Sequence, residues 1–108
     1  MTSEVHRQSP IQPGELAPDF DLPAITTSGD EIRVRLQEEL RHGPVLLIFY
    51  QDDGMPVCTS ELKAFAQEFE TLRAADVGVF GINTNGVFSH RKFQERDRFP
   101  FPLISDFY

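Results

Sequence analysis

A single cysteine, Cys58, is the residue of this sequence best suited to covalent chemistry. It follows a polar segment, residues 51–57, that Gly54 and Pro56 mark as a loop, and it precedes a stretch with helical spacing. A thiol in the first turn of a helix faces unpaired N–H groups and the positive end of the helix dipole, and both favour the reactive thiolate. The alternative is one more small buried residue, the usual fate of a lone cysteine. Position alone leaves both interpretations open.

The other chemistry-bearing residues are weaker candidates. Asp52, Asp53 and Glu61 lie near Cys58 in the sequence, and negative neighbours disfavour a thiolate. The histidines are scattered and none has metal-ligand spacing with Cys58, so no metal is expected. For His90 the sequence favours a surface or capping role over catalysis. Five glutamates are expected on solvated helix surfaces: Glu38, Glu39, Glu61, Glu68 and Glu70.

The elements that position Cys58 are expected on either side of it. The continuous apolar run 45–50 predicts a central strand covered on both faces, as in a parallel sheet. From residue 58 to residue 75, apolar side chains recur every three or four positions, which predicts an amphipathic helix. Pro56 suits the first turn of that helix, where a missing N–H costs nothing.

The pattern continues after this helix. Residues 77–82 predict a second buried strand, and residues 87–98 predict a second helix with Phe88 and Phe93 facing inward. Asn85 is a plausible cap for that helix. Residues 103–104 are expected to start a further strand.

The chain ahead of the apolar run predicts a strand hairpin. Residues 20–25 and 31–35 flank a turn, and residues 36–41 predict one helical turn stopped by Gly43. The order of strands and helices is typical of an α/β fold with a parallel core. Residues 1–13 predict a flexible N-terminal arm, and residues 14–108 the domain.

Composition limits the class of protein. A chain of 108 residues with 40% hydrophobic content allows one packed core. The net charge of −7 argues against a nucleic-acid partner. No apolar run approaches the length of a membrane span, and the N-terminus lacks the apolar centre of a secretion signal. One cysteine permits no internal disulfide, which indicates a reducing compartment such as the cytoplasm.

The segment from Val45 to Leu62 resembles the active-site segment of peroxiredoxins, in particular the bacterioferritin comigratory protein branch of the alkyl hydroperoxide reductase/thiol-specific antioxidant family. Three further stretches agree in order: residues 14–20, 81–93 and 99–106. The likeness runs from about Gly14 to Asp106. The motifs together are specific for this family, whereas no single motif would be.

This resemblance implies a thioredoxin-like fold of the peroxiredoxin type. It implies that Cys58 attacks hydrogen peroxide or an alkyl hydroperoxide as a thiolate and becomes a sulfenic acid. An external thiol, either thioredoxin-like or of low molecular weight, would then reduce the sulfenic acid. The active-site loop would include four further residues: Met55, Pro56, Val57 and Glu61. No metal or organic cofactor is implied.

The sequence departs from the family pattern at several positions. Gln51 stands where the family has Pro, and Met55 stands where it has Thr or Ser. A thioether is a weak acceptor and cannot donate the hydrogen bond that the family's hydroxyl supplies. Lys63 occupies the place of the branch's resolving cysteine, and no Arg matches the family's late active-site Arg. Any turnover would therefore need a thiol from outside the chain.

The resemblance also implies an antiparallel hairpin and a last helix that these 108 residues do not contain. Without them, the strand leading to Cys58 would form an exposed apolar edge. The sequence thus predicts either a part of a longer protein or a chain covered by a partner, such as a swapped homodimer. A scaffold without peroxidase activity, acting as a redox sensor or interaction module, is the alternative function. A thioredoxin-type oxidoreductase is disfavoured, since there is no Cys-x-x-Cys.

Overall fold

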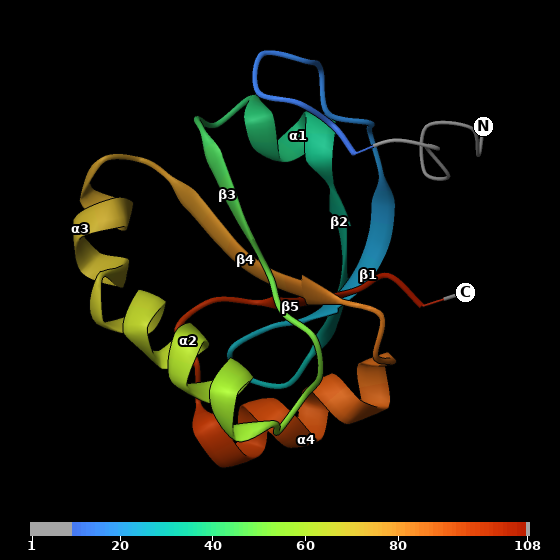
Figure 1. The fold of residues 1–108 in the computed structure, drawn as a ribbon, viewed down its shortest axis with the longest axis vertical. Coiled ribbons are helices and arrows are strands. Elements are labelled where there is room, and N and C mark those ends of the chain that lie inside the picture. The colour runs from blue at the N-terminus through green and yellow to red at the C-terminus, as the bar shows by residue number, and fades with distance from the viewer. Residues whose placement is uncertain (1–9, 108) are drawn as a thin grey trace.

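A computed structural model describes residues 10–107 of the chain as a five-stranded sheet with helices packed against it (Figure 1). The strands are β1 (Asp21–Ile25), β2 (Glu31–Arg35), β3 (Val45–Phe49), β4 (Gly78–Asn83) and β5 (Leu103–Ser105). The helices are α1 (Leu36–Leu40), α2 (Pro56–Gln67), α3 (Phe69–Ala74) and α4 (Val87–Asp97). Residues 1–9 of the predicted arm lie outside the described residues, and the boundary between arm and domain stays a prediction.

The sheet has the order β2-β1-β5-β4-β3. Strands β3, β4 and β5 are parallel, while β1 runs antiparallel to both β2 and β5. The α/β architecture with a parallel core and a leading hairpin is therefore confirmed. Because parallel strands end at the same edge, the carboxyl ends of β3, β4 and β5 bring three separate chain segments together.

The predicted helix 58–75 is wrong in its continuity. It begins at Pro56, and it breaks at Glu68, whose φ of −93° and ψ of 2° lie outside the helical range. There the N–H of Glu68 bonds the carbonyl oxygen of Phe65 in a tighter turn. Beyond the break, Phe69 and Leu72 still pack against the core.

Two apolar clusters lie on opposite faces of the sheet. One cluster lies under α2 and α4 and contains Cys58, Leu62 and Phe93. The other cluster contains Ala24, Val34, Phe80, Ile82 and Ile104. Successive side chains of β4 alternate between the two clusters, as the period of a strand requires.

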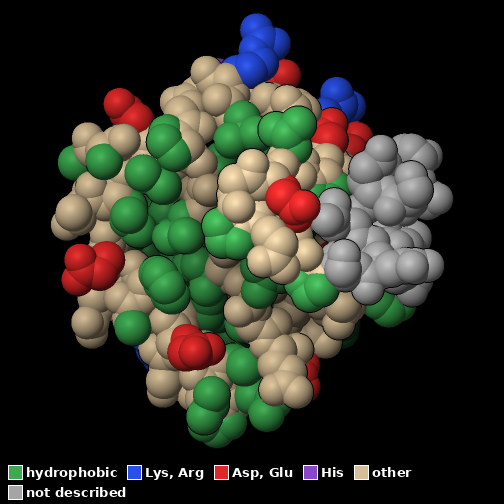
Figure 2. Space-filling model, turned by 45° about the horizontal axis from the view of Figure 1, so that its top comes forward, with side chains coloured by type: hydrophobic (Ala, Val, Ile, Leu, Met, Phe, Trp, Pro, Cys, Tyr) green, Lys and Arg blue, Asp and Glu red, His purple; other side chains and the backbone are tan. Residues whose placement is uncertain are grey.

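Strand β3 is an edge strand within the described part of the chain, not the central strand that its apolar run predicts. Only β4 pairs with it, and Phe49 at its end is 72% exposed. The exposed apolar edge implied by the family resemblance is thus confirmed. Figure 2 shows many apolar side chains on one face of the molecule, with few charges among them. None of the helices described over residues 10–107 is long and apolar enough to cross a membrane.

Candidate active site

Cys58 is the third residue of α2, directly after the loop that leaves β3. Met55 is the N-cap residue and Pro56 the first helical residue. The first turn of α2 carries no acidic side chain. Of the three acidic neighbours in the sequence, Asp52 and Asp53 precede this turn and Glu61 follows it. The N–H groups of this turn point toward the N-terminus of the helix, and together with the dipole they favour an anionic sulfur.

The thiol of Cys58 lies at the surface of the core rather than in open solvent. Cys58 is 4% exposed and belongs to the apolar cluster that also holds Tyr50, Leu62 and Phe93. Little of Cys58 is therefore open to a reagent in solvent. The position of Cys58 at the start of a helix favours a thiolate, whereas its burial among apolar side chains opposes one.

The other predicted loop residues point outward. Val57 is 70% exposed and Met55 39% exposed, and Pro56 and Glu61 are also exposed. The side chain of Met55 makes no capping hydrogen bond, although its carbonyl oxygen accepts the N–H of Thr59 at 2.9 Å. The hydroxyl of Thr59 is buried and has no hydrogen-bond partner. The start of α2 thus lacks the side-chain oxygen that usually caps a helix.

The best-connected polar group of the loop is the carboxylate of Asp53, which the sequence identified only as a negative neighbour. Tyr50 Oη, Ser89 Oγ and Asn83 Nδ2 donate hydrogen bonds to it at 2.7, 2.7 and 3.1 Å. Nδ1 of His90 lies 2.7 Å from Asp53 Oδ2. These partners come from the ends of β3 and β4 and from the first turn of α4, so one carboxylate joins three elements.

Asn85 supports this arrangement instead of capping α4. Its Oδ1 accepts the backbone N–H of Asp53 at 2.8 Å and the amide of Asn83 at 3.0 Å. The N-cap residue of α4 is Gly86, which makes no side-chain cap. The capping prediction for Asn85 is wrong because the loop before α2 takes up its side-chain oxygen.

His90 does not have the surface or capping role that the sequence favours. Its side chain is fully buried, and its Nε2 lies 2.9 Å from the carbonyl oxygen of Ile104 in β5. The signal for burial was present in the spacing, since His90, Phe93 and Gln94 form the inward stripe of α4. Phe88, which was expected to face inward, is 67% exposed, with Lys92 Nζ 5.1 Å from its ring centroid.

The network fixes two protonation states. Burial alone would raise the pKa of Asp53, but the hydrogen bonds from His90 and Ser89, the charge of His90 and the hydrogen bond from Tyr50 together lower that pKa below its ordinary value. Burial, the charge of Asp53 and the hydrogen bond to it raise the pKa of Tyr50 far above its ordinary range. At neutral pH the group is therefore an ionised carboxylate beside a neutral phenol.

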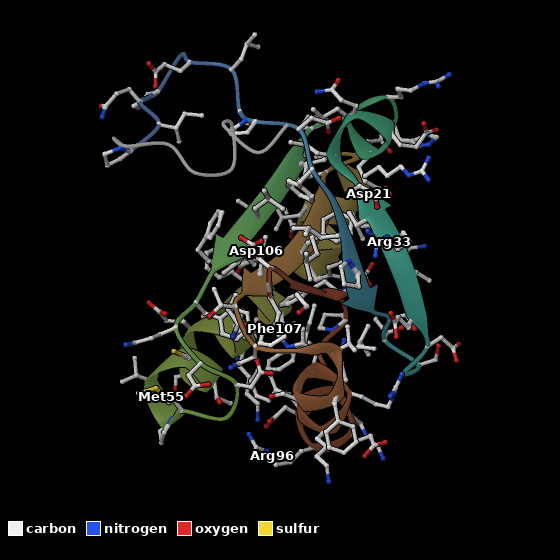
Figure 3. The ribbon with its side chains drawn as sticks, turned by 90° about the vertical axis from the view of Figure 1, so that its right-hand side faces the viewer. Asp21, Arg33, Met55, Arg96, Asp106 and Phe107 are labelled. Atoms are coloured by element: carbon white, nitrogen blue, oxygen red, sulfur yellow. The ribbon has the colours of Figure 1, made fainter. Side chains whose placement is uncertain are left out.

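Two cations lie on the other side of the loop. Arg96 covers Gly54, because a Cβ built on that glycine would lie 3.2 Å from the guanidinium. Lys63, at the place of the branch's resolving cysteine, pairs with Asp97 at 3.3 Å, and Asp97 also accepts from Arg96 at 2.8 Å. Figure 3 shows Met55 and Arg96 at the same end of the molecule. Residues 10–107 contain no cluster of three or more side chains that could hold a metal ion.

A thioredoxin-like sheet with a cysteine at the start of α2 defines the broad class of thiol proteins with a thioredoxin-like fold. The chain belongs to the AhpC/TSA family, whose profile matches residues 13–107. A peroxiredoxin of the bcp type from Coxiella burnetii is 35% identical over 96 residues, covering 89% of this chain and 60% of that protein. A Mycobacterium tuberculosis peroxiredoxin is 38% identical over 99 residues, with the same two coverages. This chain thus spans about three fifths of the length of those relatives.

Solved structures show the same fold. The peroxidoxin BcpB of Mycobacterium tuberculosis superimposes with a TM-score of 0.70 at 36% identity, covering 82% of this chain and 55% of that one. The reduced 2-Cys peroxiredoxin of Plasmodium vivax gives a TM-score of 0.80 at 24% identity, covering 86% of this chain and 61% of that one. At that identity the second comparison supports the fold alone.

Proposed function

We propose that this chain carries the peroxide-reacting half of a thiol peroxidase, with Cys58 as the single peroxidatic residue. The observation that carries the proposal is the place of Cys58 as the third residue of α2, at the carboxyl edge of the parallel strands, within a domain of the AhpC/TSA family. Hydrogen peroxide and alkyl hydroperoxides are the proposed substrates.

The proposed reaction needs no group beyond the thiol and two co-substrates. The Cys58 thiolate attacks the terminal peroxide oxygen, so that an S–O bond forms while the O–O bond breaks. The other oxygen leaves as an alkoxide or hydroxide and takes a proton from solvent. The sulfur has lost two electrons to the peroxide and is a sulfenic acid.

An external thiol completes the proposed cycle. Its sulfur attacks the sulfenic sulfur, water leaves, and a mixed disulfide forms. A second external thiol then releases Cys58 and leaves as the disulfide of the reductant. A thioredoxin-like protein or a low-molecular-weight thiol fits this role, because Cys58 is the chain's only cysteine.

The test is the second-order rate of hydrogen peroxide consumption by the reduced protein, with sulfenic acid trapped and located by mass spectrometry. Cys58→Ser should abolish both signals. The double variant Cys58→Ser/Ser60→Cys supplies a matched baseline, because it places a thiol on the exposed position 60 of the same helix. A wild-type rate no higher than that of the double variant would refute the peroxidase.

A second candidate function is a peroxiredoxin-like scaffold that acts as a redox sensor or interaction module. The thioether of Met55, at the N-cap where the family has a hydroxyl, favours it, and so does the burial of Cys58. The two candidates separate on turnover, since a sensor would form the sulfenic acid once and slowly. A homodimer that covers the β3 edge, and a cytoplasmic location, are further parts of the proposal.

A further inference from the structure

We propose that His90 is a buried imidazolium, ion-paired with Asp53, and that it is a positioning residue for the loop that presents Cys58. The charge state follows from the hydrogen-bond geometry alone. The effect on Cys58 chemistry rests on the proposed function, and it is tested separately below.

The proton count starts from the two acceptors that the imidazole ring faces. The carbonyl oxygen of Ile104, 2.9 Å from Nε2, has no proton to give, so Nε2 must carry one. Nδ1 lies 2.7 Å from Asp53 Oδ2. A neutral ring with its proton on Nε2 would set a nitrogen lone pair against an ionised carboxylate at that distance, which is repulsive. The Asp53–His90 pair therefore holds a second proton between Nδ1 and Oδ2.

The surroundings of Asp53 decide which partner keeps that proton. Its two oxygens already accept from Tyr50, Asn83 and Ser89, and each of these donors stabilises the carboxylate ion. The proton thus belongs to His90, and the side chains of the pair are 0% and 5% exposed.

Other charged groups lie near the pair on several elements. Cys58 of α2 and Asp52 of the loop both act on the phenol of Tyr50. Lys92 and Arg96 of α4 line the same surface pocket as Asp53. Their charges have both signs, so the assignment rests on the direct contacts of the ring.

The pair connects the middle of the protein to the start of α2. His90 lies on α4 and bonds β5, whereas Asp53 lies two residues before the N-cap residue Met55. Gly54 between them has a φ of +83°, a conformation that few other residues adopt. With Asp53 fixed and Gly54 confined to this turn, the direction of the first turn of α2 is set, and with it the position of Cys58.

The first experiment reads the charge directly. Nitrogen-15 chemical shifts of the His90 ring in the reduced wild-type protein should show both ring nitrogens protonated at neutral pH. The ring of His42, which is exposed, is the internal reference for the chemical shifts. An unprotonated Nδ1 or Nε2 at neutral pH in His90 would overturn the assignment, whatever the protein does with peroxide.

The second experiment tests positioning with His90→Asn, which can keep a donor near Asp53 but loses the charge and the bond to Ile104. The rate with hydrogen peroxide should fall roughly ten- to a hundredfold, because attack depends on alignment. The rate with iodoacetamide, which tolerates many approach directions, should not fall. His42→Asn is the matched control and should change neither rate. Equal losses in both His90→Asn rates would make the role merely structural and refute positioning.

Amide hydrogen exchange provides a readout that needs no peroxidase activity. In His90→Asn the N–H groups of Asp53 and Thr59, which bond Asn85 Oδ1 at 2.8 Å and the carbonyl oxygen of Met55 at 2.9 Å, should exchange faster, while those of β2 keep their wild-type rates. If His90→Asn does not fold, Asp53→Asn replaces it, since it removes the ion pair from the other side and keeps the shape of the side chain. Unchanged exchange at these two residues in the folded variant would refute positioning. A wild-type peroxide rate at the free-thiol baseline would instead refute the proposed function.

Discussion

At the scale of single residues, the loop before α2 divides its side chains between two surroundings. Asp53 and Cys58 face inward, while Met55 and Val57 face solvent. The inward side chains are held by hydrogen bonds and apolar packing, and the outward ones are not. Substitutions at the outward positions can therefore change the chemistry at the start of α2 with little change to the fold.

Met55 is the position where a single change is expected to increase activity. Met55→Thr supplies a hydroxyl at the N-cap, which should stabilise α2 by about 1 kcal/mol. It also restores the hydroxyl that the family resemblance implies at this position, so the rate with hydrogen peroxide should rise about tenfold or more. Met55→Val has nearly the same shape as Thr without the hydroxyl and is the control. Equal peroxide rates for the two variants would contradict the prediction.

Asp53 is expected to make the stability of the protein depend on acid pH. Because folding lowers the pKa of this carboxylate, its ionised form stabilises the folded state above the unfolded pKa of about 4, and this stabilisation is lost as the pH falls below that value. The free energy of unfolding, from urea titrations between neutral pH and pH about 2, should fall less steeply in Asp53→Asn than in the wild type. Parallel curves for the two proteins would assign the acid sensitivity to other carboxylates.

At the scale of elements, strand β4 lies between two layers of side chains and contains two glycines, Gly78 and Gly81. The space available for an added side chain differs between them. A Cβ on Gly81 would lie 2.9 Å from Leu103 Cδ2 and 3.2 Å from Tyr50 Cε1. On Gly78 the nearest atom would be Phe80 Cε2 at 3.5 Å, which is an ordinary contact. The same strand thus contains a crowded site and a matched open one.

Gly81→Ala is therefore expected to destabilise the protein by about 1–3 kcal/mol, because Leu103 and Tyr50 must shift. Gly78→Ala should be neutral or stabilising by up to about 1 kcal/mol, since it reduces the freedom of the unfolded chain. Urea unfolding of both variants tests the pair. If Gly78→Ala lowered the free energy of unfolding as much as Gly81→Ala, the cause would be the substitution of glycine in β4 as such and not the crowding at Gly81.

The sequence predicted the elements well and their contacts less well. Each strand and helix lies within a few residues of its apolar pattern, because periodicity reflects which face is buried. The pattern could not show that β3 is an edge strand, since an apolar run looks the same wherever its strand lies in a sheet. It identified Cys58 by type and position. It missed the pair of Asp53 and His90, because 37 residues separate two groups that meet only through the sheet.

At the scale of the whole molecule, the exposed edge of β3 is expected to control association. Phe49 on this strand is 72% exposed, and an unpaired apolar strand is a template for another chain. Phe49→Lys should shift sedimentation toward the monomer. Phe107, 70% exposed but outside the strands (Figure 3), is the matched control, and Phe107→Lys should leave association unchanged. A wild-type protein that is monomeric at high concentration would contradict the prediction.

The place of β5 also bears on how the protein is made. Its three residues lie in the middle of the sheet, where they pair with β1 of the hairpin on one side and with β4 on the other. On a ribosome the hairpin and the Cys58 region would emerge first, and neither could complete its sheet until residue 105 had left the exit tunnel. Until then the nascent chain would expose the apolar faces of two unfinished pieces, and a chaperone that binds such faces would find them there.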